Sequence, residues 1–134
     1  MERLFVDTSA WFALVNAKDP MHDAVEALLR AFDGRLTTSN YVVDETVTLC
    51  RYRLGHAAAV RVGQTLFDDE LLDLMRVSPE DERRAWELFV RRRDQSYSFT
   101  DCTSFTLLRR LGLKSVAAID DDFRAEGFSV SPTR

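Results

Sequence analysis

Short apolar segments alternate along this chain with longer segments in which apolar residues recur at helical spacing. The short segments are typical of strands and the longer ones of amphipathic helices. Strands that alternate with helices form parallel sheets whose faces are covered by those helices. The sequence therefore predicts an α/β fold with a doubly wound, mainly parallel sheet of four to five strands flanked by helices.

The pattern also gives approximate bounds for each element. Strands are expected at Arg3 to Val6, Leu36 to Thr38, Leu71 to Val77, Val116 to Ile119 and Phe128 to Val130. Helices are expected at Ser9 to Asn16, Pro20 to Asp33, Tyr41 to Leu54, His56 to Asp68, from Pro79 onward, and from Asp101 to Leu111. In the helix after Pro79, the residues expected to face inward are Ala85, Trp86, Phe89 and Val90.

Length and composition predict one ordinary domain over residues 1–134, because 46% of the 134 residues are hydrophobic. No apolar run approaches the roughly 18 residues of a membrane span, and the first residues do not resemble a secretory signal. We therefore expect a cytoplasmic protein with no membrane partner. Cys50 and Cys102 match neither a disulfide framework nor the spacing of metal ligands, which favours buried free thiols.

The net charge of −4 argues against nonspecific nucleic-acid binding through bulk charge. The basic residues are nevertheless nearly all arginine, the side chain best suited to bidentate phosphate recognition. They concentrate at Arg51 and Arg53, Arg83 and Arg84, Arg91 to Arg93, and Arg109 and Arg110. Each concentration is either a phosphate-binding surface or a solvated helix face with acidic partners.

Acidic residues lie at the ends of several predicted elements. Asp7 follows the first strand, Asp120 follows the strand that ends at Ile119, and Asp101 opens a helix. Taken singly, each has an ordinary explanation as a helix cap or a turn residue. In a doubly wound sheet, however, all three would face the crevice beyond the carboxyl ends of the strands.

Such a cluster has an electrostatic cost, since two carboxylates about 4 Å apart repel by about 4 kcal/mol at an effective dielectric constant near 20. The cluster therefore needs protons or cations. Oxygen ligands favour Mg²⁺ or Mn²⁺ over zinc, and His22 and His56 are the only imidazoles in the chain. A further acid is expected on the helix from Tyr41 to Leu54, where periodicity does not distinguish Asp44 from Glu45.

Four blocks of sequence resemble a known family. They are Phe5-Val6-Asp7-Thr8-Ser9-Ala10-Trp11, Asn40 to Thr46, Ser98-Phe99-Thr100-Asp101-Cys102, and Ala118-Ile119-Asp120-Asp121-Asp122-Phe123 with Gly127-Phe128. In this order and at these distances, they resemble the PIN-domain ribonucleases of the VapC toxin type, over nearly the whole chain. The resemblance implies a PIN-like version of the predicted α/β fold.

The resemblance also implies roles for individual residues. Asp7, Glu45, Asp101 and Asp120 match the acidic quartet, and Asp122 matches an auxiliary fifth acid. Metal ligation is assigned to Asp7, Asp101 and Asp120, and orientation of the carboxylates or of a water molecule to Thr8, Ser9 and Thr100. The chain departs from the pattern at Ile119, where relatives often have Thr or Phe, and in its three consecutive aspartates, which leave the roles of Asp120 and Asp122 undivided.

The implied activity is Mg²⁺-dependent hydrolysis of RNA phosphodiester bonds, with Mn²⁺ as an alternative cation and Glu45 acting on the attacking water. The implied partners are an RNA substrate, a small antitoxin protein and a second copy of the chain. Apolar residues of the first helix, Trp11, Phe12 and Leu14, are expected either in the core or in one of these contacts.

Three alternatives remain open from the sequence. One is a PIN nuclease that processes RNA without being a toxin, and another is a PIN-like domain that only binds RNA or protein. The third, from a different class, is a phosphoacceptor receiver domain, which is also a parallel α/β fold with acids at strand ends. A receiver needs a lysine at the end of its last core strand, whereas Lys114 precedes the strand that begins at Val116.

Overall fold

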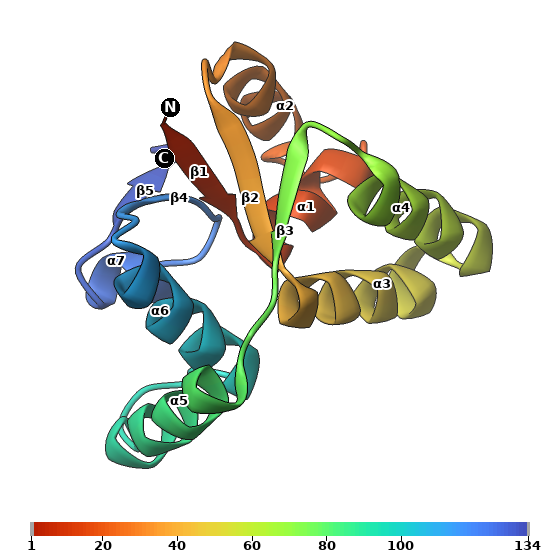
Figure 1. The fold of residues 1–134 in the computed structure, drawn as a ribbon. Coiled ribbons are helices and arrows are strands. Elements are labelled where there is room, and N and C mark those ends of the chain that lie inside the picture. Colours follow the sequence, from red (N-terminus) through yellow and green to blue (C-terminus); the bar gives the residue numbers. More distant parts are fainter. Residues whose placement is uncertain (1, 134) are drawn as a thin grey trace.

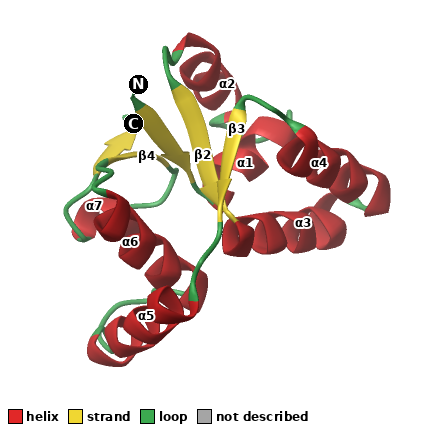
Figure 2. Ribbon diagram, in the orientation of Figure 1, coloured by secondary structure: helices red, strands yellow, loops and turns green. Residues whose placement is uncertain are grey.

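A computed structural model describes residues 2–133 of the chain. One parallel sheet has the order β3-β2-β1-β4-β5, as Figures 1 and 2 show. The strands are β1 (Arg3–Val6), β2 (Arg35–Ser39), β3 (Leu72–Met75), β4 (Ser115–Ala117) and β5 (Ser129–Ser131). The helices are α1 (Thr8–Val15), α2 (His22–Ala31), α3 (Asn40–Leu54), α4 (His56–Asp68), α5 (Pro79–Arg91), α6 (Phe99–Leu111) and α7 (Asp122–Ala125). The predicted parallel α/β architecture is confirmed.

The strand order reverses at β1, in the middle of the sheet. The chain passes from β1 to β2 and β3 on one side, and then crosses to β4 and β5 on the other. In open α/β sheets such a reversal leaves a crevice outside the carboxyl ends of the central strands. Phe5 and Val6 of β1 and Val116 and Ala117 of β4 are fully buried, so a rigid apolar core supports this edge.

The α5–α6 pair lies to one side of the sheet. Figure 2 shows α5 packed on α6 and extending away from the strands. The buried stripe of α5 consists of Asp81, Ala85 and Leu88. The prediction that Trp86, Phe89 and Val90 face inward is wrong, since they are 57%, 38% and 56% exposed. The helical period was correct, but the stripe of Asp81, Ala85 and Leu88 is the one that faces inward, where Asp81 pairs with Arg110.

Several element bounds also differ from prediction, among them those of β3, which covers Leu72–Met75 and not Leu71 to Val77. The helix expected from Pro20 begins at His22, because the Asp19 carboxylate accepts a hydrogen bond from the Met21 N–H and forms a turn instead. The strand expected to run to Ile119 ends at Ala117. Asp101 does not open α6 but occupies its third position, because Ser98 is the N-cap.

Other local predictions are confirmed. Gly112 ends α6 in a left-handed conformation with φ of 70°, and Ser78 caps α5 with Pro79 at its first position. Cys50 and Cys102 are buried free thiols. Within residues 2–133, no helix is long and apolar enough to cross a membrane.

The Asp81 carboxylate joins α5 to α6 and gives a first testable prediction. Its side chain is 1% exposed, accepts bonds of 2.8 Å from Nε and Nη2 of Arg110, and also accepts the Ser78 N–H. Asp81→Ala should therefore lower the free energy of unfolding by about 2–3 kcal/mol, less than a fully buried pair would lose because Arg110 can be hydrated.

Urea denaturation measures this change, and Glu80→Ala is the control. Glu80 pairs with Arg83 and Arg84 at the surface, where ion pairs contribute under about 1 kcal/mol. Equal losses in the two variants would show that the Asp81–Arg110 pair contributes no more than a surface pair.

Candidate active site

Asp7 lies at the carboxyl end of β1, beside β4. Its N–H donates to the Ala117 carbonyl at 2.9 Å, and its side chain caps α1. Asp7 is 3% exposed, and Oδ2 accepts hydrogen bonds from the hydroxyl and the N–H of Ser9 at 2.9 and 3.3 Å. Oδ1 is buried with no hydrogen-bond partner among the described residues. One oxygen of a buried carboxylate is thus left for a ligand outside the chain.

Asp101 is held beside the same crevice by the start of α6. Its Oδ2 accepts the Ser98 N–H at 2.9 Å, and its own N–H donates to the Ser98 hydroxyl at 3.0 Å. This reciprocal capping box orients the Asp101 carboxylate, which is half-buried. Ser98 was not among the predicted site residues, although its spacing of three positions before Asp101 is the sequence signal of such a box.

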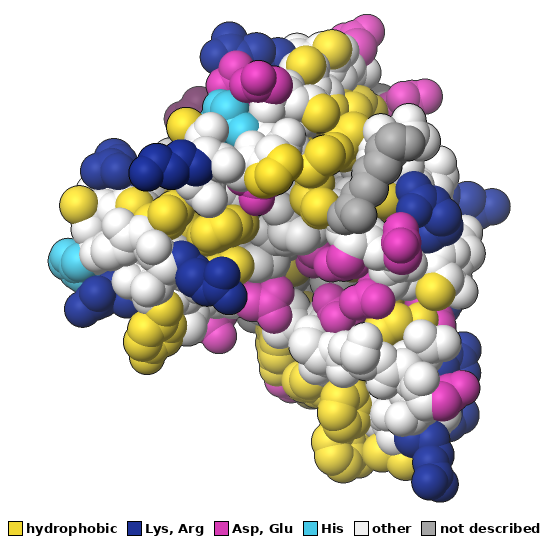
Figure 3. Space-filling model, turned by 180° about the vertical axis from the view of Figure 1, so that it is seen from behind, with side chains coloured by type: hydrophobic (Ala, Val, Ile, Leu, Met, Phe, Trp, Pro, Cys, Tyr) yellow, Lys and Arg dark blue, Asp and Glu magenta, His cyan; other side chains and the backbone are white. Residues whose placement is uncertain are grey.

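The remaining acids come from the β4–α7 connection and from α3. Asp120 accepts the Asp122 N–H at 3.2 Å, which ties these two residues together. Glu45 is half-buried and lines a hollow of about 360 Å³ that also contains Thr100, whereas Asp44 is exposed at its edge. Figure 3 shows acidic side chains gathered in the middle of one face of the molecule.

The acids repel one another through space. Burial, together with the charges of Asp101 and Asp120, raises the pKa of Asp7 to about 8, and the hydrogen bonds from Ser9 oppose this rise. Burial, together with the charges of Asp120, Asp122 and Glu45, raises the pKa of Asp101 to about 6. Burial and the neighbouring Asp120 and Asp121 also raise the pKa of Asp122. Residues over a hundred positions apart are therefore brought within electrostatic range of each other.

The donor set fits a hard divalent cation, because it offers only oxygen atoms and includes the unpartnered Oδ1 of Asp7. A ready coordination sphere is not formed, since no three His, Cys, Asp or Glu side chains of residues 2–133 are grouped closely enough to hold a metal ion. Carboxylates without a cation repel each other, so binding one requires side-chain rotation toward it. His22 is engaged elsewhere, with Nδ1 at 2.9 Å from the Ala13 carbonyl.

The three hydroxyl residues predicted to support the acids differ in what they contact. Ser9 bonds to Asp7 and also accepts the Ile119 N–H at 2.9 Å, so it joins α1 to the loop that carries Asp120. The Thr8 hydroxyl lies 3.5 Å from that of Thr46 on α3, not beside an acid. Thr100 accepts the Thr103 hydroxyl through its carbonyl, and the residue lines the hollow beside Glu45.

If the chain cleaves RNA as the sequence predicts, Ser9→Ala should lower the rate of RNA cleavage by roughly 10- to 100-fold. This is the usual cost of losing a residue that orients a metal ligand. The pKa of Asp7 should rise further, because both hydrogen bonds from Ser9 lower it and the variant keeps only the N–H. Cleavage assays and urea denaturation measure the two effects.

Ser104→Ala is the matched control, since the Ser104 hydroxyl is buried without a hydrogen-bond partner among the described residues. Its removal should leave activity unchanged and stability equal or higher. A Ser9→Ala protein as active as Ser104→Ala would show that the link between Asp7 and Ile119 is dispensable.

Comparisons with known proteins identify the family of this chain. The PIN domain family matches residues 4–128. The 23S rRNA-specific endonuclease VapC20 of Mycobacterium tuberculosis is 40% identical over 125 residues, which are 93% of this chain and 95% of that protein. The VapC ribonuclease of Archaeoglobus fulgidus is 31% identical over 117 residues, covering 84% of this chain and 74% of its own.

Solved structures give the same result. The crystal structure of Mycobacterium tuberculosis VapC20, described as a sarcin-ricin loop cleaving toxin, superposes with a TM-score of 0.89 at 39% identity and covers 93% of this chain and 95% of that one. The family match removes the receiver-domain alternative, and Lys114 indeed lies before β4, at the far edge of the sheet from the acids. The chain belongs to the PIN-domain family and, within it, to the VapC group.

Proposed function

We propose that this chain is a single PIN domain that acts as a Mg²⁺- or Mn²⁺-dependent endoribonuclease and is the toxin of a toxin–antitoxin pair. The observation that carries the proposal is the buried, unpartnered Oδ1 of Asp7 among four further acids at the crevice between β1 and β4. A cation would neutralise the buried Asp7 and the half-buried acids around it, and it would supply the Lewis acid for phosphodiester hydrolysis.

In this mechanism Asp7, Asp101 and Asp120 hold the divalent cation. When bound, the cation supplies Lewis-acid stabilisation of the scissile phosphate and lowers the pKa of water. Glu45, on the facing wall from α3, positions the attacking water and accepts its proton. Asp122 adds negative charge beside Asp120 and fixes that carboxylate through its N–H. Ser9 keeps Asp7 in its orientation.

The proposed substrate is an unpaired loop of structured RNA, where base edges are accessible. The likeness to VapC20, whose name specifies 23S rRNA, favours ribosomal RNA as the substrate class. The chain would then act in the cytoplasm, where ribosomes are found.

The proposed antitoxin covers the apolar surface beside α1. Two hollows, of about 220 and 300 Å³, are both lined by Trp11 and Leu14 and by Leu66 of α4. Trp11 itself is a core residue, 5% exposed, whose indole N–H donates to the Thr38 hydroxyl, so Leu14 and its neighbours present the accessible part. The description of VapC20 as a toxin supports an inhibitory partner of this kind.

The proposed homodimer would bury a separate apolar surface. Trp86 stacks on Phe89 with ring centroids 5.8 Å apart, and Phe99 contacts both rings from α6. Together with Val90, these residues leave a large apolar area exposed on α5, as interaction surfaces do. Light scattering of the wild type and of Trp86→Glu measures whether this surface joins two copies, because a buried charge would separate them.

The experiment that tests the proposed activity is incubation of the pure protein with ribosomes and with structured RNA, with Mg²⁺, with Mn²⁺ and with EDTA. Cleavage at a defined site is expected only with a cation, and the cut ends can be mapped in the RNA. Binding without cleavage would support the RNA-binding alternative instead, and cleavage restricted to precursor RNA would support a processing enzyme.

The three consecutive aspartates provide an internal comparison. Asp120→Asn should reduce the cleavage rate about a hundredfold or more, since it removes a carboxylate proposed to hold the cation. Asp121→Asn should retain wild-type activity, because the Asp121 side chain is 79% exposed and pairs with Arg124. Equal effects of the two substitutions would contradict the role assigned to Asp120.

A further inference from the structure

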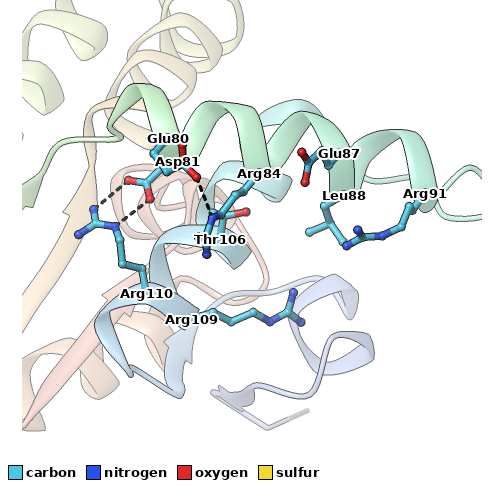
Figure 4. Close-up of a pocket in the computed structure, with 9 residues that line it drawn as sticks. All are labelled: Glu80, Asp81, Arg84, Glu87, Leu88, Arg91, Thr106, Arg109 and Arg110. Atoms are coloured by element: carbon cyan, nitrogen blue, oxygen red, sulfur yellow. Dashed lines mark hydrogen bonds and ion pairs between the residues drawn. The ribbon is translucent and has the colours of Figure 1, made fainter.

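A large hollow lies away from the acids, between α5 and α6. Its volume is about 750 Å³, and four of the side chains that line it are arginines. Arg84 and Arg91 come from α5, while Arg109 and Arg110 come from α6, so the cations lie on both walls (Figure 4). We name this hollow the arginine groove.

The arginines of the groove differ in how far they are already engaged. Arg110 donates with both Nε and Nη2 to Asp81 and is a structural residue. Arg84 uses only Nε, to Glu80, and Arg109 uses only Nη2, to the carbonyl and carboxylate of Glu126. Arg91 makes no hydrogen bond or ion pair within residues 2–133. Guanidinium groups with free donors thus remain on both walls.

The carboxylates around the groove do not cancel its charge. Glu80, Asp81 and Glu126 are each paired with at least one arginine, and Glu87 is the remaining acid of the lining. Four arginines, Arg84, Arg91, Arg109 and Arg110, line the groove against three acids, Glu80, Asp81 and Glu87. This local excess of positive charge occurs in a protein whose net charge is −4.

The other described hollows offer no comparable surface. The hollow at Glu45 is acidic, and the two at Trp11 are mainly apolar. The one between α3 and α4, which contains Val47, Tyr52 and Phe67, has a single arginine. Phosphate binding depends on cations that replace counterions, and Arg is the side chain that forms two parallel bonds to a phosphate. Of these hollows, the arginine groove therefore offers the most arginines to a phosphate-rich ligand.

We propose that the arginine groove binds the sugar–phosphate backbone of the RNA substrate outside the bond that is cleaved, with Arg84, Arg91 and Arg109 as the phosphate-binding residues. This inference rests on the proposed endoribonuclease function. It assigns recognition and cleavage to two separate places, which keeps the attracting cations away from the acids that repel phosphate.

The position of the groove on α6 suits a strand that extends beyond the cleaved bond. Asp101 and Arg109 are eight positions apart on this helix, which is about 12 Å along its axis. The backbone phosphates at Arg109 therefore belong to nucleotides a few positions from the cleaved bond. Short substrates that end before this point should not contact the arginine groove, so its arginines should not affect their binding.

The test compares three double variants by the salt dependence of RNA binding in EDTA, where nothing is cleaved. For Arg84→Gln/Arg91→Gln, the slope of log K against log salt should become shallower by about 1.4, the value for two lost contacts to a single strand. Affinity at moderate salt should fall about tenfold. Arg84→Lys/Arg91→Lys should keep most of the slope, because it keeps both charges.

Arg30→Gln/Arg53→Gln is the matched control, since it removes two exposed arginines of α2 and α3. It should leave the slope unchanged. If all double variants change the slope equally, the protein binds RNA through its overall charge and the arginine groove has no special role.

Cleavage kinetics with Mg²⁺ supply a second readout. The Gln double variant should raise KM for a long structured RNA about tenfold at unchanged kcat, and should leave cleavage of a trinucleotide unchanged. If the wild type cleaves RNA but the Gln double variant has the same KM and the same salt slope as the wild type, this inference alone is overturned. A wild type that neither binds nor cleaves RNA would overturn the proposed function as well.

Discussion

Asp7→Asn is expected to abolish RNA cleavage and at the same time to stabilise the metal-free protein. Loss of the carboxylate that we propose to hold the cation should cost about 4 kcal/mol of transition-state stabilisation, a rate reduction of about a thousandfold. The stability gain follows from the pKa of about 8 that burial and the neighbouring acids impose on Asp7. An amide carries no charge to desolvate, so the free energy of unfolding near neutral pH should rise by on the order of 2–4 kcal/mol.

The control for this prediction separates the charge of Asp7 from its role as a helix cap. Asn is as good an N-cap as Asp, and its Oδ1 can accept the two hydrogen bonds that Ser9 donates. Asp7→Ala removes both the charge and the cap, so it should be equally inactive but about 1 kcal/mol less stable than Asp7→Asn. An Asp7→Asn protein that unfolds would show that Asp7 serves the fold, and one that cleaves RNA would show that it does not hold the cation.

Metal-free stability should fall as the pH rises, which is the second large expected effect. Folding raises the pKa of Asp7 from 3.8 to about 8 and that of Asp101 from 3.8 to about 6. The native state therefore binds these protons more tightly than the unfolded state, and their contribution to stability is greatest below about pH 4. It is lost as the pH rises to about 8, with Asp101 contributing only up to about pH 6.

Groups with lowered pKa values act in the opposite direction but at lower pH. Hydrogen bonds from Arg35 and Arg110 lower the pKa values of Asp73 and Asp81. The stability that these two carboxylates contribute is therefore complete once the pH exceeds their pKa values in the unfolded chain. Between pH 5 and pH 8 the raised groups dominate. The free energy of unfolding in EDTA should fall by on the order of 3–5 kcal/mol over this range, as measured by urea denaturation.

A divalent cation should restore the stability that is lost between pH 5 and pH 8, because it neutralises the carboxylates in place of the protons. At a Mg²⁺ or Mn²⁺ concentration a hundredfold above Kd, binding stabilises the native state by about 2.7 kcal/mol at pH 8. At pH 5 the gain should be much smaller, since protons compete for the same carboxylates. Asp7→Asn should abolish most of the pH dependence and of the cation effect. A wild type that becomes more stable between pH 5 and pH 8 in EDTA would contradict the repulsion among these acids.

Local sequence rules accounted for most of the elements of this fold. The strand at Arg3 to Val6, the helix from His56 to Asp68 and the end of α6 at Gly112 agree with prediction, because each depends on nearby residues. Local rules failed on α5, where apolar residues at helical spacing were assigned to the core. Which stripe of an amphipathic helix is buried depends on its partner, and the partner of α5 is a helix whose Arg110 pairs with Asp81.

The acids show the same division between local and tertiary information. The sequence by itself determined which side chains are candidates for the chemistry, since carboxylates at strand ends and helix starts could be identified one by one. It could not distinguish Glu45 from Asp44 by periodicity, nor show that Ser98 orients Asp101. Only the tertiary structure decided that the charges of Asp101 and Asp120 act on Asp7. The three residues come close together because the chain crosses from β3 to β4 on the other side of β1. Electrostatic energy depends on distance in space, and no local pattern encodes the distance between residues a hundred positions apart.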